Sequence, residues 1–329
     1  MRPGVSIARA GCLVAALAPC AAGCGKTLAL GSSSPIPYAF DTPVMVAELA
    51  SPSRTDNPTL TADLLEIYFT TDRVSGNGDV WFATRASPSG PFGAPAPVSA
   101  VNGDSFETSS AISADGLTLW FGSDRAGGIG QEDVWVSQRP SRAGAWSTPV
   151  NVVELNTADD DIPRPPGQHQ LVMPMASTKM TANNPAAGNY QTYLAPRANA
   201  GAPFMAPVAI PELDFTDRST VDGFLTDDGL TMFYSSAPVT EPADAAVAVP
   251  DGGRLADAGK VDAGAPNSDL YVAFRRSTDE QIWLTQPLGD LNTPADEKDP
   301  WLSPDGTTLY FTSNRSGVLN IYTAQVKPR

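Results

Sequence analysis

The chain has 329 residues, of which 42% are hydrophobic and 17% are charged, and this balance excludes intrinsic disorder of the whole chain. Its formal charge is −15 at pH 7. Because so acidic a surface repels phosphate backbones and anionic headgroups, we expect no nucleic acid partner and no flat adsorption on a membrane.

The first 23 residues predict a bacterial signal peptide. Arg2 and Arg9 form a basic start, and the apolar stretch at 10–22 is too short to span a bilayer as a stable helix. The stretch ends in Ala21-Ala22-Gly23-Cys24, which resembles a lipobox with Cys24 as the lipidated residue. A plain secretory signal without lipid is the alternative. We therefore expect a protein of the bacterial cell envelope, anchored to the outer membrane through its lipid alone, on the periplasmic or the surface side.

Residues 24–37 predict a short flexible tether, because the segment contains the small polar run Gly31-Ser32-Ser33-Ser34-Pro35. All three cysteines, Cys12, Cys20 and Cys24, lie at or before the lipobox cysteine. The mature domain therefore has no disulfide and no cysteine-based metal site. Removal of residues 1–23 takes away two arginines and no acid, which changes the formal charge from −15 to −17.

From residue 38 onward one phrase recurs with a period of roughly 50 residues, which is typical of a β-propeller. A small polar turn leads into an aromatic strand, and the strand ends in Ser/Thr with Asp/Asn-Arg in most copies. Clear copies lie at 61–73, 113–125, 226–236 and 303–315, and a degenerate copy lies at 164–173. Each unit also contains an aromatic residue before a Pro-apolar pair and, in most copies, an Asp/Asn-apolar-aromatic strand such as Asp79-Val80-Trp81. We predict an all-β, five-bladed propeller of four-stranded antiparallel blades over residues 38–329, with six blades as the alternative.

The two ends of the chain predict how the ring closes. The last unit stops after its third strand, at Tyr322 to Val326, and so lacks an outer strand. The segment Phe40 to Leu49 is an outer-strand phrase with no blade before it. Pairing the two would complete the last blade and remove an open sheet edge.

The repeat resembles the WD-repeat-like β-propeller family, of the type found in the propeller domain of TolB. The matching features are the Ser-Pro-Asp-Gly run at Ser303 to Gly306, the aromatic pairs after it, the Asp-Arg turns and the Asp-apolar-aromatic strands, and they extend over 40–329. The third unit departs from the pattern, and an insertion at about 237–268, predicted to be disordered, enlarges the fourth. The resemblance implies a periplasmic or surface binding scaffold and says little about activity.

One polar position recurs four residues before the repeat's Ser/Thr. It is occupied by Asn57, Ser109, Asp222 and Asp299, with Asp160 or Asp161 in the third unit. We expect these residues to precede the innermost strands and to converge at the channel mouth, where propellers bind ligands. Clustered carboxylates there would bind Ca²⁺ or sugar hydroxyls, or would act as acid and base on a glycoside. Capping of strand ends is the structural alternative.

The remaining residues contain no strong catalytic signature. His169 is the sole histidine of the chain and falls in the turn of the degenerate copy, where an exposed turn residue is expected. We therefore predict a non-catalytic, monomeric envelope lipoprotein that binds a protein, peptide or glycan. No cofactor is expected, with Ca²⁺ as the one alternative. The competing hypothesis is a carbohydrate-active hydrolase that uses two channel carboxylates.

Overall fold

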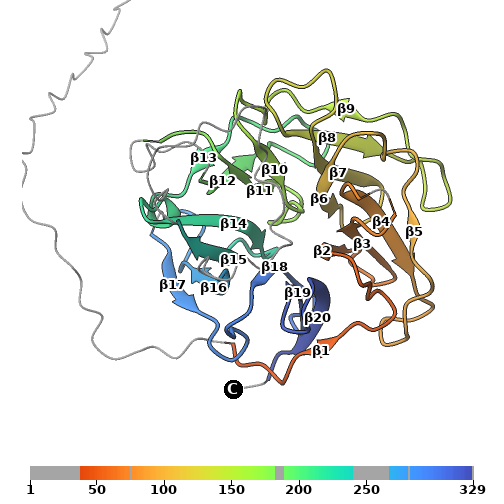
Figure 1. Ribbon diagram of the computed structural model, residues 1–329. Coiled ribbons are helices and arrows are strands. Elements are labelled where there is room, and N and C mark those ends of the chain that lie inside the picture. Colours follow the sequence, from red (N-terminus) through yellow and green to blue (C-terminus); the bar gives the residue numbers. More distant parts are fainter. Residues whose placement is uncertain (1–37, 75, 182–188, 240–266, 281, 328–329) are drawn as a thin grey trace, which may run out of the picture. The chain divides into compact units, whose positions relative to one another are not determined.

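The computed structural model describes residues 38–74, 76–181, 189–239, 267–280 and 282–327, and residues 36–329 form one compact unit. Five four-stranded antiparallel sheets surround a common centre, so the predicted five-bladed propeller is confirmed (Figure 1). The sixth blade is excluded, because every described strand belongs to one of these five sheets. The innermost strands contact one another around the channel at four of the five junctions between blades, and β11 (Val172–Ser177) of blade 3 contacts β14 (Arg218–Leu225) of blade 4 at the fifth.

The blades follow one another in chain order, each running from its innermost to its outermost strand. Blade 1 comprises β2 (Thr55–Leu60), β3 (Glu66–Thr71), β4 (Asp79–Thr84) and β5 (Ala96–Pro97). Blade 2 comprises β6 (Glu107–Ile112), β7 (Thr118–Ser123), β8 (Asp133–Gln138) and β9 (Val150–Asn151). Blade 3 comprises β10 (Asp161–Pro163), β11 (Val172–Ser177), β12 (Gln191–Pro196) and β13 (Val208–Ala209). Blade 4 comprises β14 (Arg218–Leu225), β15 (Thr231–Pro238), β16 (Asp269–Phe274) and β17 (Leu284–Pro287).

Blade 5 confirms the predicted closure. It comprises β18 (Glu297–Leu302), β19 (Thr308–Ser313), β20 (Asn320–Gln325) and, as its outer strand, β1 (Val44–Met45) from the other end of the chain. Val44 pairs with Thr323 and Met45 with Tyr322, and an isolated bridge joins Phe40 to Val326. The first and the last described strands of the chain thus share one sheet.

The hydrophobic core lies between neighbouring blades. Five clusters of buried side chains each combine residues from two adjacent sheets. Phe121 of blade 2, for example, belongs to one cluster with Tyr68 and Val80 of blade 1, and all three are fully buried. Burial of each such large side chain contributes about 1.5–3 kcal/mol, so the blade interfaces hold the ring together.

The repeated polar turns connect the two innermost strands of most blades. Ser113 donates a hydrogen bond to Asp115, and its Oγ accepts one from the backbone N–H of Thr118. Gly116 closes this turn at φ +75°, a backbone conformation that glycine adopts without steric cost. Thr226 with Asp228 and Ser303 with Asp305 repeat the side-chain hydrogen bond. These turns surround one end of the channel.

The arginines of the Asp/Asn-Arg turns have a structural role. Arg125 donates to Glu107 Oε1 at 2.8 Å and to the carbonyl of Val101, and Arg315 donates to Glu297 Oε1 at 3.0 Å and to the carbonyl of Leu291. Each guanidinium therefore joins the innermost strand of its blade to the preceding loop. Recurrence in two blades indicates a role in the fold rather than at a single site.

Within the described ranges, no helix is long and apolar enough to cross a membrane. The predicted signal peptide and tether lie outside the described residues, as does most of the insertion expected at about 237–268. Ala237 and Pro238, which we had assigned to the insertion, instead extend β15 and pair with Ser219 and Arg218.

Candidate functional site

Four of the predicted site residues occupy the same place in their blades. Asn57, Ser109, Asp222 and Asp299 have φ angles of 54°, 50°, 62° and 56°, and the strand register shifts around each of them. A β-bulge inserts an extra residue, and Asn and Asp tolerate the left-handed conformation that this one requires. The four residues thus lie within the innermost strands, 7%, 2%, 5% and 4% exposed respectively, and not ahead of the strands at an open mouth.

Blade 3 differs because its innermost strand has no bulge. Asp161, Ile162 and Pro163 pair with Ser177, Ala176 and Met175 in continuous register. Asp161 instead accepts hydrogen bonds from Thr157, at 2.6 Å from the backbone nitrogen and 2.8 Å from Oγ1. Asp160 is half-buried, and its backbone N–H donates to Thr178 Oγ1. Neither acid takes part in the hydrogen bonds and ion pair that connect Asn57, Asp299 and Arg164.

In blade 3, the residue that reaches the polar residues of the channel is Arg164. It stands where other blades have the turn's Ser or Thr, and its side chain is fully buried. Nη1 donates to Asn57 Oδ1 at 3.1 Å and lies 3.8 Å from Asp299 Oδ1, and Nη2 lies 3.4 Å from the carbonyl oxygen of Pro300. The backbone N–H of Asn57 donates to Asp299 Oδ2 at 3.2 Å. One arginine therefore connects three blades across the channel.

Burial raises the pKa of acids in and beside the polar cluster, by which we mean Asn57, Arg164, Asp222 and Asp299. It raises the pKa of Asp222 to about 7, with a further rise from the charge of Asp299 and an opposing effect from Arg164. Ser235 donates a hydrogen bond to Asp222 Oδ2. Burial also raises the pKa of Asp56 to about 6, against the effect of Arg54, whose Nη1 lies 3.6 Å from Asp56 Oδ2. The side chains of the cluster are buried and have little contact with solvent.

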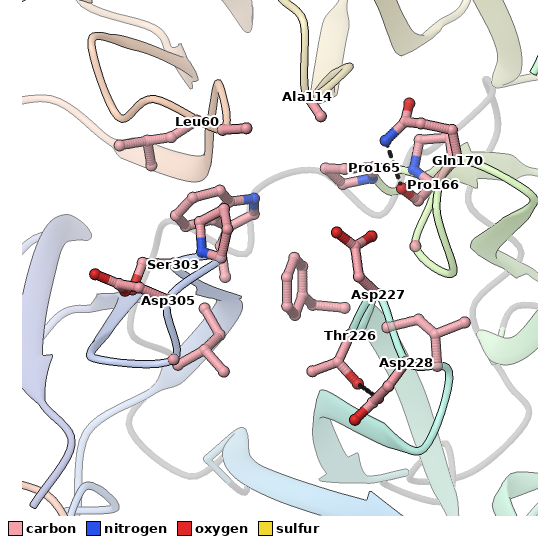
Figure 2. Close-up of a pocket in the computed structure, with 18 of the residues that line it drawn as sticks. Leu60, Ala114, Pro165, Pro166, Gln170, Thr226, Asp227, Asp228, Ser303 and Asp305 are labelled. Carbon is pink, nitrogen blue, oxygen red and sulfur yellow. Dashed lines mark hydrogen bonds between the residues drawn. The ribbon is translucent and has the colours of Figure 1, made fainter. Parts of the chain in front are cut away.

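A pocket of about 400 Å³ lies at the end of the channel that the polar turns surround (Figure 2). Phe224 and Trp301 line it, and each follows a buried carboxyl residue, Asp222 or Asp299, by two positions along its strand. Their ring centroids are 5.8 Å apart. Both aromatic residues therefore line the pocket and are close in sequence to the buried carboxyl residues. Tyr38 also lines the pocket.

The rim of the pocket is built from the residue after the turn's Ser or Thr, or after Arg164 in blade 3. Around the ring these residues are Ala62, Ala114, Pro165, Asp227 and Pro304. Asp227 alone among them is charged, and its carboxylate points into the pocket toward Pro165 and Pro166 (Figure 2). Asp227 Oδ1 accepts a hydrogen bond from the backbone N–H of His169 at 3.2 Å. Sequence analysis placed these residues in structural turns and did not single out Asp227.

The turn of blade 3 beside the pocket adopts an uncommon conformation. Gln168, His169 and Gln170 have φ angles of 51°, 57° and 68° in succession. Such residues cost on the order of 1–3 kcal/mol each and persist where surrounding contacts impose them. Gln170 Nε2 donates to the carbonyl of Pro166 at 3.0 Å, and Gln170 lines the pocket. His169 is exposed, as predicted.

Among the residues that the structure describes, no group of three or more His, Cys, Asp or Glu side chains is arranged to hold a metal ion. In the channel, the guanidinium of Arg164 lies against Asp299 and Asn57, where a cation bound by these residues would meet its positive charge.

Comparison with known proteins supports the fold alone. No family model matches the chain, and neither does any curated protein. Among solved structures, an endo-arabinase from Bacteroides thetaiotaomicron is similar over 88% of this chain and 98% of its own, with 12% identity and a TM-score of 0.54. A candidate TolB from Agrobacterium tumefaciens matches over 84% of this chain and 78% of its own, with 10% identity and a TM-score of 0.47. An α-L-arabinofuranosidase from Lactobacillus brevis matches over 86% and 94%, with 13% identity and a TM-score of 0.49.

Proposed function

We propose that this protein is a non-catalytic binding propeller that takes its ligand, or one end of a larger protein, peptide or glycan ligand, in the pocket between the polar turns. The pocket of about 400 Å³ is the observation that carries this proposal. It falls in the size range of small-molecule sites, which are typically concave, largely apolar and equipped with a few polar groups. Trp301, Phe224 and Tyr38 provide apolar surface, and Asp227 provides a polar contact.

The buried acids of the channel suit a structural role better than a catalytic one. Asp222 and Asp299 are 5% and 4% exposed, and Arg164 lies between blades against Asp299. A glycosidase needs two carboxyl groups on either side of a bound glycosidic bond, with space for the sugar. A substrate would have to displace Arg164 from its hydrogen bond to Asn57 before it reached these acids.

A carbohydrate-active hydrolase is the second candidate, and one observation favours it. The pKa of Asp222 is raised to about 7 beside a second carboxyl group, that of Asp299, and a general acid that works near neutral pH has such a pKa. An endo-arabinase also shares the fold, although at 12% identity.

A ligand panel tests the proposal. We expect at least one amine, peptide or oligosaccharide to raise the melting temperature of the wild type, since a ligand at 100 times its Kd adds about 2.7 kcal/mol to the free energy of unfolding. Ala114→Trp places a bulky side chain on the pocket rim and should remove this shift. Ala126→Trp, on the exposed turn between β7 and β8 at the other end of blade 2, is the matched control and should retain it.

Hydrolysis assays separate the two candidates. Release of sugar from arabinan by the wild type, lost in Asp222→Asn and in Asp299→Asn but kept in Ala114→Trp, would establish the hydrolase and refute the binding propeller. Ligand binding that Ala114→Trp abolishes, without sugar release, supports the binding propeller.

The protein is further proposed to act in the bacterial envelope, held there by a lipid on Cys24. The support is the lipobox-like run Ala21-Ala22-Gly23-Cys24 after a short apolar segment. Metabolic labelling with a fatty-acid analogue should mark the wild type and leave Cys24→Ser unmarked. Cys20→Ser is the control and should label like the wild type. Equal labelling of wild type and Cys24→Ser would refute the anchor.

A further inference from the structure

We infer that the pocket selects a cationic group, a protonated amine or a guanidinium carried on an apolar body, and that Asp227 is the residue that recognises it. This inference rests on the proposed function, because it specifies the chemistry of the ligand that the same pocket would take. Three features of the pocket carry it: the orientation of Asp227, the charge of the lining, and the apolar surface around the carboxylate.

The carboxylate of Asp227 is held in place and still has an oxygen to offer. Oδ1 accepts the hydrogen bond from the backbone N–H of His169 at 3.2 Å, which orients the side chain toward the turn of blade 3. Oδ2 accepts no hydrogen bond from the described residues, and the carboxylate points into the pocket (Figure 2). A pre-oriented acceptor loses little side-chain freedom when a donor arrives.

The charged side chains that line the pocket around Asp227 are all acidic. Asp228 and Asp305 also line the pocket, whereas no described Lys or Arg does. The arginines of the adjacent turns are already engaged elsewhere. Arg197 donates to the carbonyl of Gln170 and lies over Phe204, and Arg275 donates to the carbonyl of Gly229 and lies over Trp283. A ligand cation would therefore supply the missing counter-charge.

Apolar walls strengthen this charge recognition. Pro165, Pro166 and Phe224 line the pocket with Asp227; Phe224 is partly exposed, whereas Trp301, which also lines the pocket, is only 3% exposed. Asp227 itself is exposed at the rim, and a ligand that covers it against these walls would form a charge pair less screened by water than one on an open surface. An aromatic ring attracts a cation in addition, and the walls cover the apolar body of the ligand. A neutral sugar would use the carboxylate only as a hydrogen-bond acceptor and would not require its charge.

Calorimetric titration with charge-matched probes tests the inference. N-acetyl-arginine amide is compared with N-acetyl-citrulline amide, which has nearly the same shape without the charge, and N-acetyl-lysine amide with N-acetyl-norleucine amide. Agmatine, which carries an amine and a guanidinium but no peptide group, shows whether peptide groups are needed, and arabinotriose represents neutral sugars. We expect each cationic amino-acid probe to bind at least about tenfold more tightly than its neutral partner, since hydrogen bonds to charged groups are the stronger ones. Raising the salt concentration should weaken binding of the cationic probes only.

Two variants connect this preference to Asp227. Asp227→Asn removes the charge but keeps an oxygen that accepts from His169, so it should fold and lose the preference for cations. Asp115→Asn removes the same charge from the equivalent turn of blade 2, outside the pocket lining, and should behave as the wild type does. Circular dichroism melting curves verify that both variants are folded.

The outcomes separate this inference from the proposed function. Equal affinity for the arginine and citrulline probes, or a cation preference that survives in Asp227→Asn, would overturn the inference. Binding of arabinotriose alone, abolished by Ala114→Trp, would overturn it as well and leave the binding propeller standing. If no cationic probe binds at millimolar concentration, the inference is wrong, whereas the proposed function is judged by the wider panel and the Ala114→Trp variant.

Discussion

Arg164 illustrates how one substitution in a repeat changes the centre of the molecule. In other blades the equivalent Ser or Thr bonds to an Asp of its own turn, as Ser113 does with Asp115. The third turn has proline and glycine after Arg164 and no such Asp. The long side chain reaches the channel instead and pairs with Asp299 at 3.8 Å. A buried acid without a partner would be strongly destabilising, so the arginine makes the acidic channel compatible with folding.

The protonation of Asp222 predicts how stability depends on pH. Its folded-state pKa of about 7 lies above the value of about 3.9 expected in the unfolded chain, so the folded state binds more protons between these limits. The contribution of Asp222 is therefore fully present below about pH 4 and is lost as pH rises through 7. We expect Asp222→Asn to flatten this fall, so that the variant gains stability relative to the wild type at pH 8 but not at pH 4.

Urea denaturation at a series of pH values between 4 and 8 measures this effect. Asp299 and Arg164 face Asp222 in the channel and Lys298 also acts on it, so all three are kept unchanged in the comparison. Asp279→Asn removes an exposed acid in a loop of the same blade and should leave the slope as in the wild type. A slope that is identical in wild type and Asp222→Asn would mean that Asp222 is ionised in the folded protein throughout this range.

At the scale of single elements, the sequence predicted the strands better than it predicted their irregularities. The predicted Asp-apolar-aromatic strand at Asp79-Val80-Trp81 lies in β4, and each repeat corresponds to one blade. The bulges at Asn57, Ser109, Asp222 and Asp299 were not predicted, because register depends on how two strands pair and not on either strand's composition. The same positions could nevertheless be picked out, since a polar residue recurs there in phase.

The pocket could not be predicted from the sequence either, because it depends on how separate turns come together in space. Its rim residues, such as Ala114 and Asp227, belong to turns whose Gly and Asp have an obvious structural role. What distinguishes Asp227 is its direction and the absence of a basic residue among the described lining, and both depend on how five turns meet around a centre. A carboxylate that replaces Ala or Pro at one turn in five is the signal that, in retrospect, pointed to this residue.

The left-handed turn of blade 3 shows how neighbouring elements support one another. Gln168 donates its backbone N–H to the carbonyl of Thr226 at 3.3 Å, and His169 donates to Asp227. Arg197 donates to the carbonyl of Gln170 at 2.7 Å. These contacts, from blade 4 and from the residue that follows β12, hold three residues in a conformation that none of them favours alone. The turn in return holds Asp227 at the pocket.

At the scale of the whole molecule, stability depends on the closure of the ring. Each hydrophobic cluster joins two adjacent blades, so a blade with a missing strand weakens the interfaces on both of its sides. The segment that completes blade 5 carries Phe40 and Leu49, which are 4% and 0% exposed and belong to two different clusters. Its backbone also pairs with the chain's other end, where the N–H of Val46 donates to the carbonyl of Ile321.

Two truncations test this closure. A chain that starts at residue 50 lacks β1, Phe40 and Leu49, whereas a chain that starts at residue 38 retains them and is the matched control. Loss of two large buried side chains costs several kcal/mol, on the order of 3–5 for a buried Phe alone, and the exposed edge of β20 offers unpaired backbone groups to other chains. We expect the shorter chain to melt at a much lower temperature and to aggregate by light scattering, and the control to behave as the full chain does. Equal melting temperatures for the two truncations would mean that the segment is a tether and that blade 5 is stable with three strands.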